Sequence, residues 1–485
     1  MPMATAQPLF ATLNQTDASR RVWNDAWLGL VVGGAGGLLQ GSILHSSLLS
    51  ATSLGAGFGL VFGLVFSKRA SSAGAGLIWG MSSALLFWFL ILATGISKFG
   101  THDSNGMLDY ARGRFSILAA YLVCLGAPVG TALGIRGGIL PDSSRPRFNR
   151  SRAIVAGGLA GVVSGLIFGH WMWEGGFFPL IAGLGDIQSQ AVKVILQFCV
   201  AFMIGATFGL LFQRDVRGYG SCMGWGLGYT VLWWFAGPLT LFPLAGRMPL
   251  NWSMDAATQL FGALVGYILY GLILGVVYAT FDRAWVRLFI ESDPINREPD
   301  GPGFRLFRSL QWGALAGLAG GLVSSPFMFA AHVLSSVAGV ATQLSTLSGL
   351  LVHLLVSAFI GMSYGVLFRD EASNLAMAGA WGWVFGLIWW YVGPLTLLPL
   401  ILTGEIDWRI SAASALLPSL LGHLIYGACT ASLFYILERS YTSKHMLDPR
   451  MSARELRRLR PVGTPAPALW FFAMGMGVVI PLLLA

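Results

Sequence analysis

The stretch WWFAGPLTLFPL at residues 233–244 recurs as WWYVGPLTLLPL at residues 389–400, and this repetition decides how the chain is organised. The match continues at the same offset, without a gap, from Gly205 to Arg283 in the first copy. Chance does not produce an ungapped match of this length. The sequence therefore predicts two copies of one structural unit.

Apolar runs surround both copies, and each is close to the 20 or so residues that a helix needs to cross a bilayer. They predict thirteen transmembrane helices near residues 26–44, 48–66, 73–95, 115–135, 153–172, 191–212, 221–245, 257–280, 310–334, 347–368, 375–402, 412–436 and 468–485. The composition agrees, because 55% of the 485 residues are hydrophobic and 11% are charged. A soluble chain carries about 25% charged residues. We therefore predict an all-α, polytopic membrane protein.

A third, diverged copy precedes the other two. Six residues, among them Trp79, Trp88 and Tyr121, match the second copy at a shorter offset, but Leu92 and Ser97 stand where that copy has proline. Repeats of four spans all face the same way, so we predict parallel repeats in a pseudo-threefold ring. The predicted organisation is a cytoplasmic segment (1–25), repeat one (26–136), repeat two (153–283), repeat three (305–439), a basic cytoplasmic linker (440–467) and a C-terminal transmembrane helix (468–485).

The distribution of charge predicts the orientation. The formal net charge is +9, yet few of the 30 Lys and Arg residues fall in alternate loops once the N-terminus is placed in the cytoplasm. This is the positive-inside pattern, and it puts the C-terminus outside. The basic residues are accounted for in this way, so we expect no nucleic acid partner.

The repeated WW…GPLTL…PL stretch supplies the first candidate functional residues. Proline cannot donate a backbone hydrogen bond, so the third helix of repeats two and three should kink or break there. Broken helices often line transport sites. The alternative is a structural kink, with the tryptophans at the headgroup belt. The candidates are Trp233, Trp234, Gly237, Pro238, Pro243, Trp389, Trp390, Gly393, Pro394 and Pro399.

Intramembrane polar residues are the second group of candidates, because such residues are costly in lipid and often functional. His353 and His423 lie within predicted spans, and Tyr426 lies on the same helical face as His423. The corresponding residues of repeat two are Tyr267 and Tyr270. His423 could relay a proton or bind haem; the alternative is a neutral, hydrogen-bonded imidazole.

Other features exclude several kinds of site. The four cysteines are far apart and form no Cys-x-x-Cys motif, so we predict neither a metal site nor a bound cofactor. No Asp or Glu lies in the middle of a predicted span, where ion-coupled transporters usually keep one. Glycines spaced three and four apart predict close helix packing. The run 454–460 could form a basic helix on lipid, or act only as an inner anchor.

The segments Phe242–Leu244 and Gly266–Gly271, with their counterparts Leu398–Leu400 and Gly422–Gly427, resemble the YagU-like bacterial inner-membrane proteins. The similarity covers the last two helices of each repeat, and Ser419 stands where that family has an acidic residue. The resemblance implies location in a bacterial inner membrane.

Two functions remain open from the sequence. One is a conduit for a small solute or ion, which the predicted helix breaks favour. The other is a structural or scaffold subunit of a larger membrane complex, which the apolar, glycine-rich faces favour. A haem- or quinone-binding protein is a third interpretation. We expect no enzymatic activity, since no nucleophile and base are paired, and the expected partners are membrane lipid and membrane proteins.

Overall fold

The computed structural model describes residues 7–96, 104–139, 148–174, 190–216, 218–245, 249–250, 252–289, 302–330, 346–445 and 466–485. Within these ranges every regular element is a helix, and 13 helical segments are long and apolar enough to cross a membrane. The expected all-α polytopic class with thirteen spans is therefore confirmed, and the chain is a multi-pass membrane protein.

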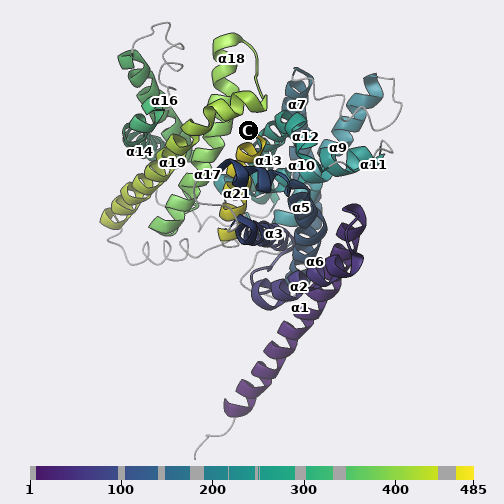
Figure 1. The fold of residues 1–485 in the computed structure, drawn as a ribbon. Helices are drawn as coiled ribbons and strands as arrows, with labels where there is room; N and C mark the ends of the chain where they lie inside the picture. Colours follow the sequence, from purple (N-terminus) through teal and green to yellow (C-terminus); the bar gives the residue numbers. More distant parts are fainter. Residues whose placement is uncertain are drawn as a thin grey trace, which may run out of the picture. The chain divides into compact units, whose positions relative to one another are not determined.

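The spans are built from the following helices, labelled in Figure 1 where there is room: α1 (Gln7–Ile43), α2 (Leu48–Phe66), α3 (Ala73–Ile96), α5 (Phe115–Ala120) with η1 (Tyr121–Gly126) and α6 (Ala127–Ile139), α7 (Arg150–Glu174), α9 (Gln190–Phe212), α10 (Tyr219–Ala236) with η2 (Gly237–Leu241) and α11 (Phe242–Ala245), α13 (Phe261–Phe289), α14 (Pro302–Ala330), α16 (Thr346–Leu367), α17 (Leu375–Val392) with η5 (Gly393–Leu397) and α18 (Leu398–Thr403), α19 (Ile410–His445) and α21 (Pro467–Leu484). Two short helices, α4 (Ser104–Arg112) and α12 (Met254–Gln259), precede α5 and α13.

The contacts divide the chain into two compact parts. The first holds residues 1–147 with 250–254, and in it α2 lies along α1 and α3 lies along α6. Glycine permits the α1–α2 contact, because a Cβ on Gly29 would lie 2.1 Å from the carbonyl oxygen of Gly59. The predicted use of glycine for close helix packing is met at this contact.

The second part holds residues 148–249 and 255–485, which include repeats two and three and the last span. In repeat two, α7 pairs with α9 and α10 pairs with α13; in repeat three, α14 pairs with α16 and α17 pairs with α19. The last helix, α21, packs against α10, α17 and α19. Tyr391 on α17 donates a hydrogen bond to the carbonyl oxygen of Gly477 on α21, at 3.1 Å. The C-terminal span therefore packs between α10 and α17 within this part of the chain.

A tryptophan joins the third and fourth helices in the same way in all three sequence repeats. The indole nitrogen donates to the backbone carbonyl 26 residues further on: Trp88 to Arg114, Trp234 to Leu260 and Trp390 to Leu416, at 3.1, 2.9 and 3.2 Å. Trp234 and Trp390 are fully buried. Their N–H groups bond backbone carbonyls of the neighbouring helix. The alternative that places the tryptophans at the headgroup belt stays a prediction.

An ion pair joins the first and fourth helices of each repeat near their predicted cytoplasmic ends. Arg152 pairs with Asp282 at 2.9 Å, and Arg308 pairs with Glu438 at 3.0 Å. In the first repeat the signs are reversed, with Asp25 on the first helix and Arg136 on the fourth, at 2.7 Å. These pairs neutralise charge at the helix ends. The helices α13 and α19 can therefore continue beyond the predicted ends of their apolar runs.

Candidate ligand cavity in repeat three

The repeated prolines widen the third helix and do not end it. Pro394 has no N–H group, and the backbone passes from α17 through the π-helical turn η5 into α18. In this turn the N–H of Leu398 donates to the carbonyl oxygen of Gly393. The Thr396 hydroxyl donates to the carbonyl oxygen of Tyr391 at 2.8 Å. The motif's threonine therefore satisfies one carbonyl of the widened helix.

Repeat two has the same arrangement. The turn η2 contains Pro238, and Thr240 donates to the carbonyl oxygen of Phe235 at 2.7 Å. In repeat three the indole nitrogen of Trp408 also donates to Thr396, at 3.2 Å. In both turns the threonine hydroxyl donates to the backbone carbonyl oxygen five residues before it. Pro238 and Pro394 thus lie in π-helical turns that continue the third helix of each repeat.

A cavity of about 200 Å³ lies beside η5 in repeat three. We call it the His cavity, because His353 of α16 and His423 of α19 both line it. Six of the residues singled out from the sequence come together here: Trp389, Gly393, Pro394, His353, His423 and Tyr426. Most of the remaining wall is aliphatic, from Met328, Val352, Val356, Ile360, Leu397, Leu398 and Ile401.

The side wall of the His cavity is open between α16 and α18. Val356 and Ile401 line the cavity, yet 46% and 62% of their surfaces remain exposed. Neighbouring residues on α16 are exposed apolar side chains, including Leu355 and Phe359. Such a surface is suited to lipid. The cavity therefore opens toward the membrane plane.

Each histidine bonds a backbone carbonyl oxygen through one ring nitrogen. Nε2 of His353 lies 3.2 Å from the oxygen of Gly321, and Nδ1 of His423 lies 2.9 Å from the oxygen of Ser419. A carbonyl oxygen only accepts, so in a neutral imidazole the proton sits on that nitrogen. The other nitrogen, Nδ1 of His353 and Nε2 of His423, is then an acceptor with no hydrogen-bond partner among the described residues.

The tyrosines have structural contacts in both repeats. Tyr426 donates to the carbonyl oxygen of Ser357 at 2.6 Å, and Tyr270 donates at 3.1 Å to that of Ala201, the corresponding residue. Tyr267, at the position of His423, packs against Phe168. The hydroxyls of Tyr426 and Tyr270 thus fix helix pairs in both repeats.

A second, larger hollow lies across the α17–α18 segment from the His cavity. Its volume is about 840 Å³, and we call it the outer hollow because it lies at the helix ends predicted to face outward. It is lined by Pro399, Thr403 and the loop 405–410, together with Thr258, Gln259 and Gly262 of repeat two. Pro399 therefore faces a different space from Pro394.

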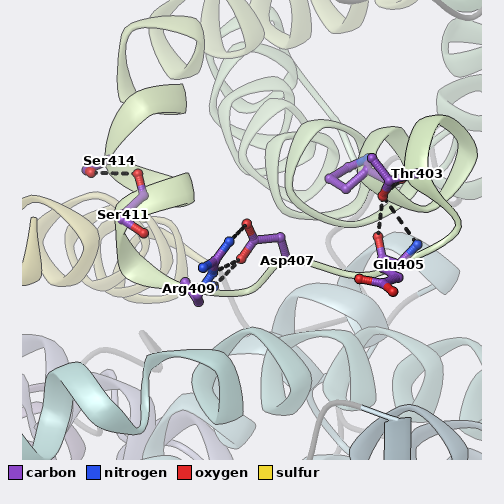
Figure 2. A network of polar contacts seen from close by, with 7 residues as sticks. Thr403, Glu405, Asp407, Arg409, Ser411 and Ser414 are labelled. Atoms are coloured by element: carbon purple, nitrogen blue, oxygen red, sulfur yellow. Dashed lines mark hydrogen bonds and ion pairs between the residues drawn. The ribbon is translucent and has the colours of Figure 1, made fainter.

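The loop beside the outer hollow carries a local polar network (Figure 2). Arg409 makes a bidentate ion pair with Asp407, with 2.8 Å from Nε to Oδ1 and 2.7 Å from Nη2 to Oδ2. The hydrogen bonds from Arg409 hold the pKa of the Asp407 carboxyl below its usual value. Thr403 bonds the backbone of Glu405 in the same loop. The outer hollow thus has a charged rim, whereas the His cavity has none.

The remaining predicted sites do not join this cavity. Trp233, Trp234, Gly237, Pro238, Pro243, Tyr267 and Tyr270 belong to repeat two and lie outside it. Among the described residues no group of three His, Cys, Asp or Glu side chains could hold a metal ion. The basic run 454–460 and most of the linker 440–467 lie outside the described residues.

The sequence did not reveal that His353 and His423 share a space, nor the aliphatic wall around them. One signal was present: Ser324 and His423 replace the Phe168 and Tyr267 of repeat two. No protein-family model, no characterised protein and no solved structure matches this chain. Similarity to YagU-like proteins therefore stays a prediction.

Proposed function

We propose that this membrane protein is a non-enzymatic conduit that moves a small, largely apolar solute between the membrane plane and the outer aqueous side. One observation carries the proposal: the segment from Gly393 to Thr403 separates two hollows. Leu397, Leu398 and Ile401 line the His cavity, and Pro399 and Thr403 line the outer hollow. A shift of this short segment would join the two spaces.

The linings of the two hollows favour an uncharged solute over an ion. The His cavity has no charged side chain in its wall, and an ion would be left without compensation there. The wall itself is suited to movement, since a π-helical turn between proline residues is a frequent place for local rearrangement. The outer hollow, with Asp407 and Arg409 at its rim, is the aqueous end of the proposed route.

Cysteine labelling tests the conduit directly. Cys199 is exposed and Cys429 is half-buried, so both are first replaced with serine. In that background we expect Leu397→Cys to react with a membrane-impermeant thiol reagent added to the outer side of proteoliposomes. Leu239→Cys, a buried position in the π-helical turn of repeat two, is the control and should react more slowly. If Leu397→Cys reacts only with a membrane-permeant reagent, the conduit is wrong.

A scaffold subunit is the second candidate, and the packing of α21 favours it. This helix lies against α10, α17 and α19, so an apolar helix packs between repeats two and three. If the protein is a scaffold, partner proteins should co-purify with it from the native membrane in mild detergent. Stoichiometric partners together with an inert Leu397→Cys would replace the conduit with the scaffold. In either case we propose a bacterial inner membrane, with the N-terminus inside.

A further inference from the structure

We infer that the His cavity holds one hydrocarbon chain of a membrane lipid, which enters the cavity from the membrane plane. The inference rests on the proposed function in one respect, because it makes an alkyl-chain molecule the class of solute that the conduit handles. Three properties of the cavity support it: the chemistry of its wall, its size and the apolar surface beside its opening.

The wall of the His cavity presents carbon almost everywhere, although it includes two histidines, a serine and a tyrosine. Nε2 of His353 and Nδ1 of His423 bond backbone carbonyl oxygens, and the hydroxyl of Tyr426 donates to the carbonyl oxygen of Ser357. The second ring nitrogens of the two histidines do not face the space. A ligand with hydrogen-bonding groups would lose its bonds to water here and gain none in return, whereas a hydrocarbon has no such bonds to lose.

The size of the His cavity suits part of a single chain. An apolar protein cavity of roughly 150 Å³ stays dry and binds benzene. The His cavity is of the same kind, with about 200 Å³, so it has room for several carbon atoms of one chain. Met328 and Tyr426 line it and are almost fully buried, so they mark its closed end, whereas the exposed Val356 and Ile401 mark its opening.

Two neighbouring rows of α16, each of residues four apart, join the cavity to the lipid-facing surface. The row in the cavity wall is Val352, Val356 and Ile360, and the exposed row is Leu351, Leu355 and Phe359. Residues of this spacing share one face of a helix, so the two rows run side by side. A chain can therefore leave the cavity past Val356 and lie along the exposed row. An extended chain buries both surfaces, and a compact molecule would bury only the first.

Repeat two supplies a matched comparison within the same chain. The ring of Phe168 packs there against Tyr267 and Tyr270. Ile204, which corresponds to Ile360, is buried. We therefore expect no lipid chain beside Ile204, and this residue is the internal control.

Photolabelling tests the inference, with the purified full chain in lipid nanodiscs. The probe is a phosphatidylcholine with a diazirine near the end of one acyl chain, diluted in unlabelled phosphatidylcholine, and mass spectrometry identifies the labelled residues. We expect label on Met328 and Ile360 inside the cavity as well as on the exposed Leu355, and none above background on Ile204. Label on Leu355 without label on Met328 would overturn the inference.

Variants at the opening then show that the chain enters there. Val356→Trp and Ile401→Trp should each lower the label on Met328 roughly tenfold relative to Leu355, because the indole displaces a chain end that buries about as much apolar surface as a leucine. Both positions are exposed, so the variants should fold, and thermal unfolding checks this. Leu351→Trp, in the exposed row, is the control and should leave the ratio unchanged. Undiminished label on Met328 in both opening variants would contradict entry from the membrane plane.

A free alkyl diazirine without a head group distinguishes a lipid chain from a small apolar solute. If this free probe labels Met328 and the phospholipid probe does not, the occupant is a small molecule and the inference is wrong.

The outcomes also separate this inference from the conduit. Lipid label on Met328, with Leu397→Cys inert to the impermeant reagent, would keep the chain and remove the conduit. A reactive Leu397→Cys without lipid label on Met328 would keep the conduit and overturn the lipid chain.

Discussion

Repeats two and three differ most at one place, which is filled in repeat two and hollow in repeat three. In repeat two the ring of Phe168 packs against Tyr267 and Tyr270, with centroids 5.9 and 5.4 Å apart. In repeat three, His423 takes the position of Tyr267, and Met328 packs on Gly422 where Phe168 packs on the corresponding Gly266. The two repeats therefore fill this place with different side chains, and repeat three keeps a cavity beside Met328 and His423.

The frame around that place is the same in both repeats. The tyrosine bonds from Tyr270 and Tyr426, the tryptophan bonds from Trp234 and Trp390, and the proline-containing π-turns all recur at equivalent positions. A cavity can therefore be opened or closed within a constant set of helices. We read repeat two as the structural copy and repeat three as the one adapted to bind.

The largest effect is expected from emptying the filled site. Phe168→Ala should lower the free energy of unfolding by about 3–5 kcal/mol, because a buried ring is lost and the surrounding helices close only partly. Denaturant titration in mixed micelles measures this change, and Ser324→Ala at the corresponding position is the control. A loss as small as that of Ser324→Ala would show that the ring does not fill repeat two.

Removing the tryptophan bond should have the next largest effect. Trp390→Phe removes the indole's hydrogen bonds to the Leu416 carbonyl and to the Ser419 hydroxyl, and should cost about 1–3 kcal/mol. Trp234→Phe should cost less, because Trp390 also donates to Ser419 and Trp234 has one such bond. The same titration compares the two. A larger loss in repeat two would reverse this ranking.

The smallest effect concerns the loop at the outer hollow, where repeat three has Asp407 and Arg409 and repeat two has Asn251 and Ser253. The lowered pKa of Asp407 means that the ion pair stabilises the fold above the carboxyl's ordinary pKa. This stabilisation is lost as the pH falls through the lower folded value. Asp407→Asn should therefore lower the thermal midpoint slightly at pH 7, and the difference should vanish in strong acid. A difference that persists there would exclude the carboxylate as its source.

Much of the architecture could be predicted because the bilayer imposes a length and a polarity on every span. The thirteen apolar runs appear as thirteen helices, and the repeated prolines appear as two matching turns. The hydrogen-bond acceptor of each indole could not be predicted, because every residue has a backbone carbonyl and the sequence does not show which one lies nearby. The burial of Trp234 and Trp390 by packing was therefore not predicted.

By itself the sequence determined the helical class, the number of spans and the residues that differ between repeats. Only the tertiary structure decided that His353 and His423, on different helices, line one cavity, and that Pro394 and Pro399 face different hollows. The physical reason is that hydropathy acts on each segment separately. A cavity depends on the volumes of side chains from several helices, here α14, α16, α17 with η5 and α18, and α19.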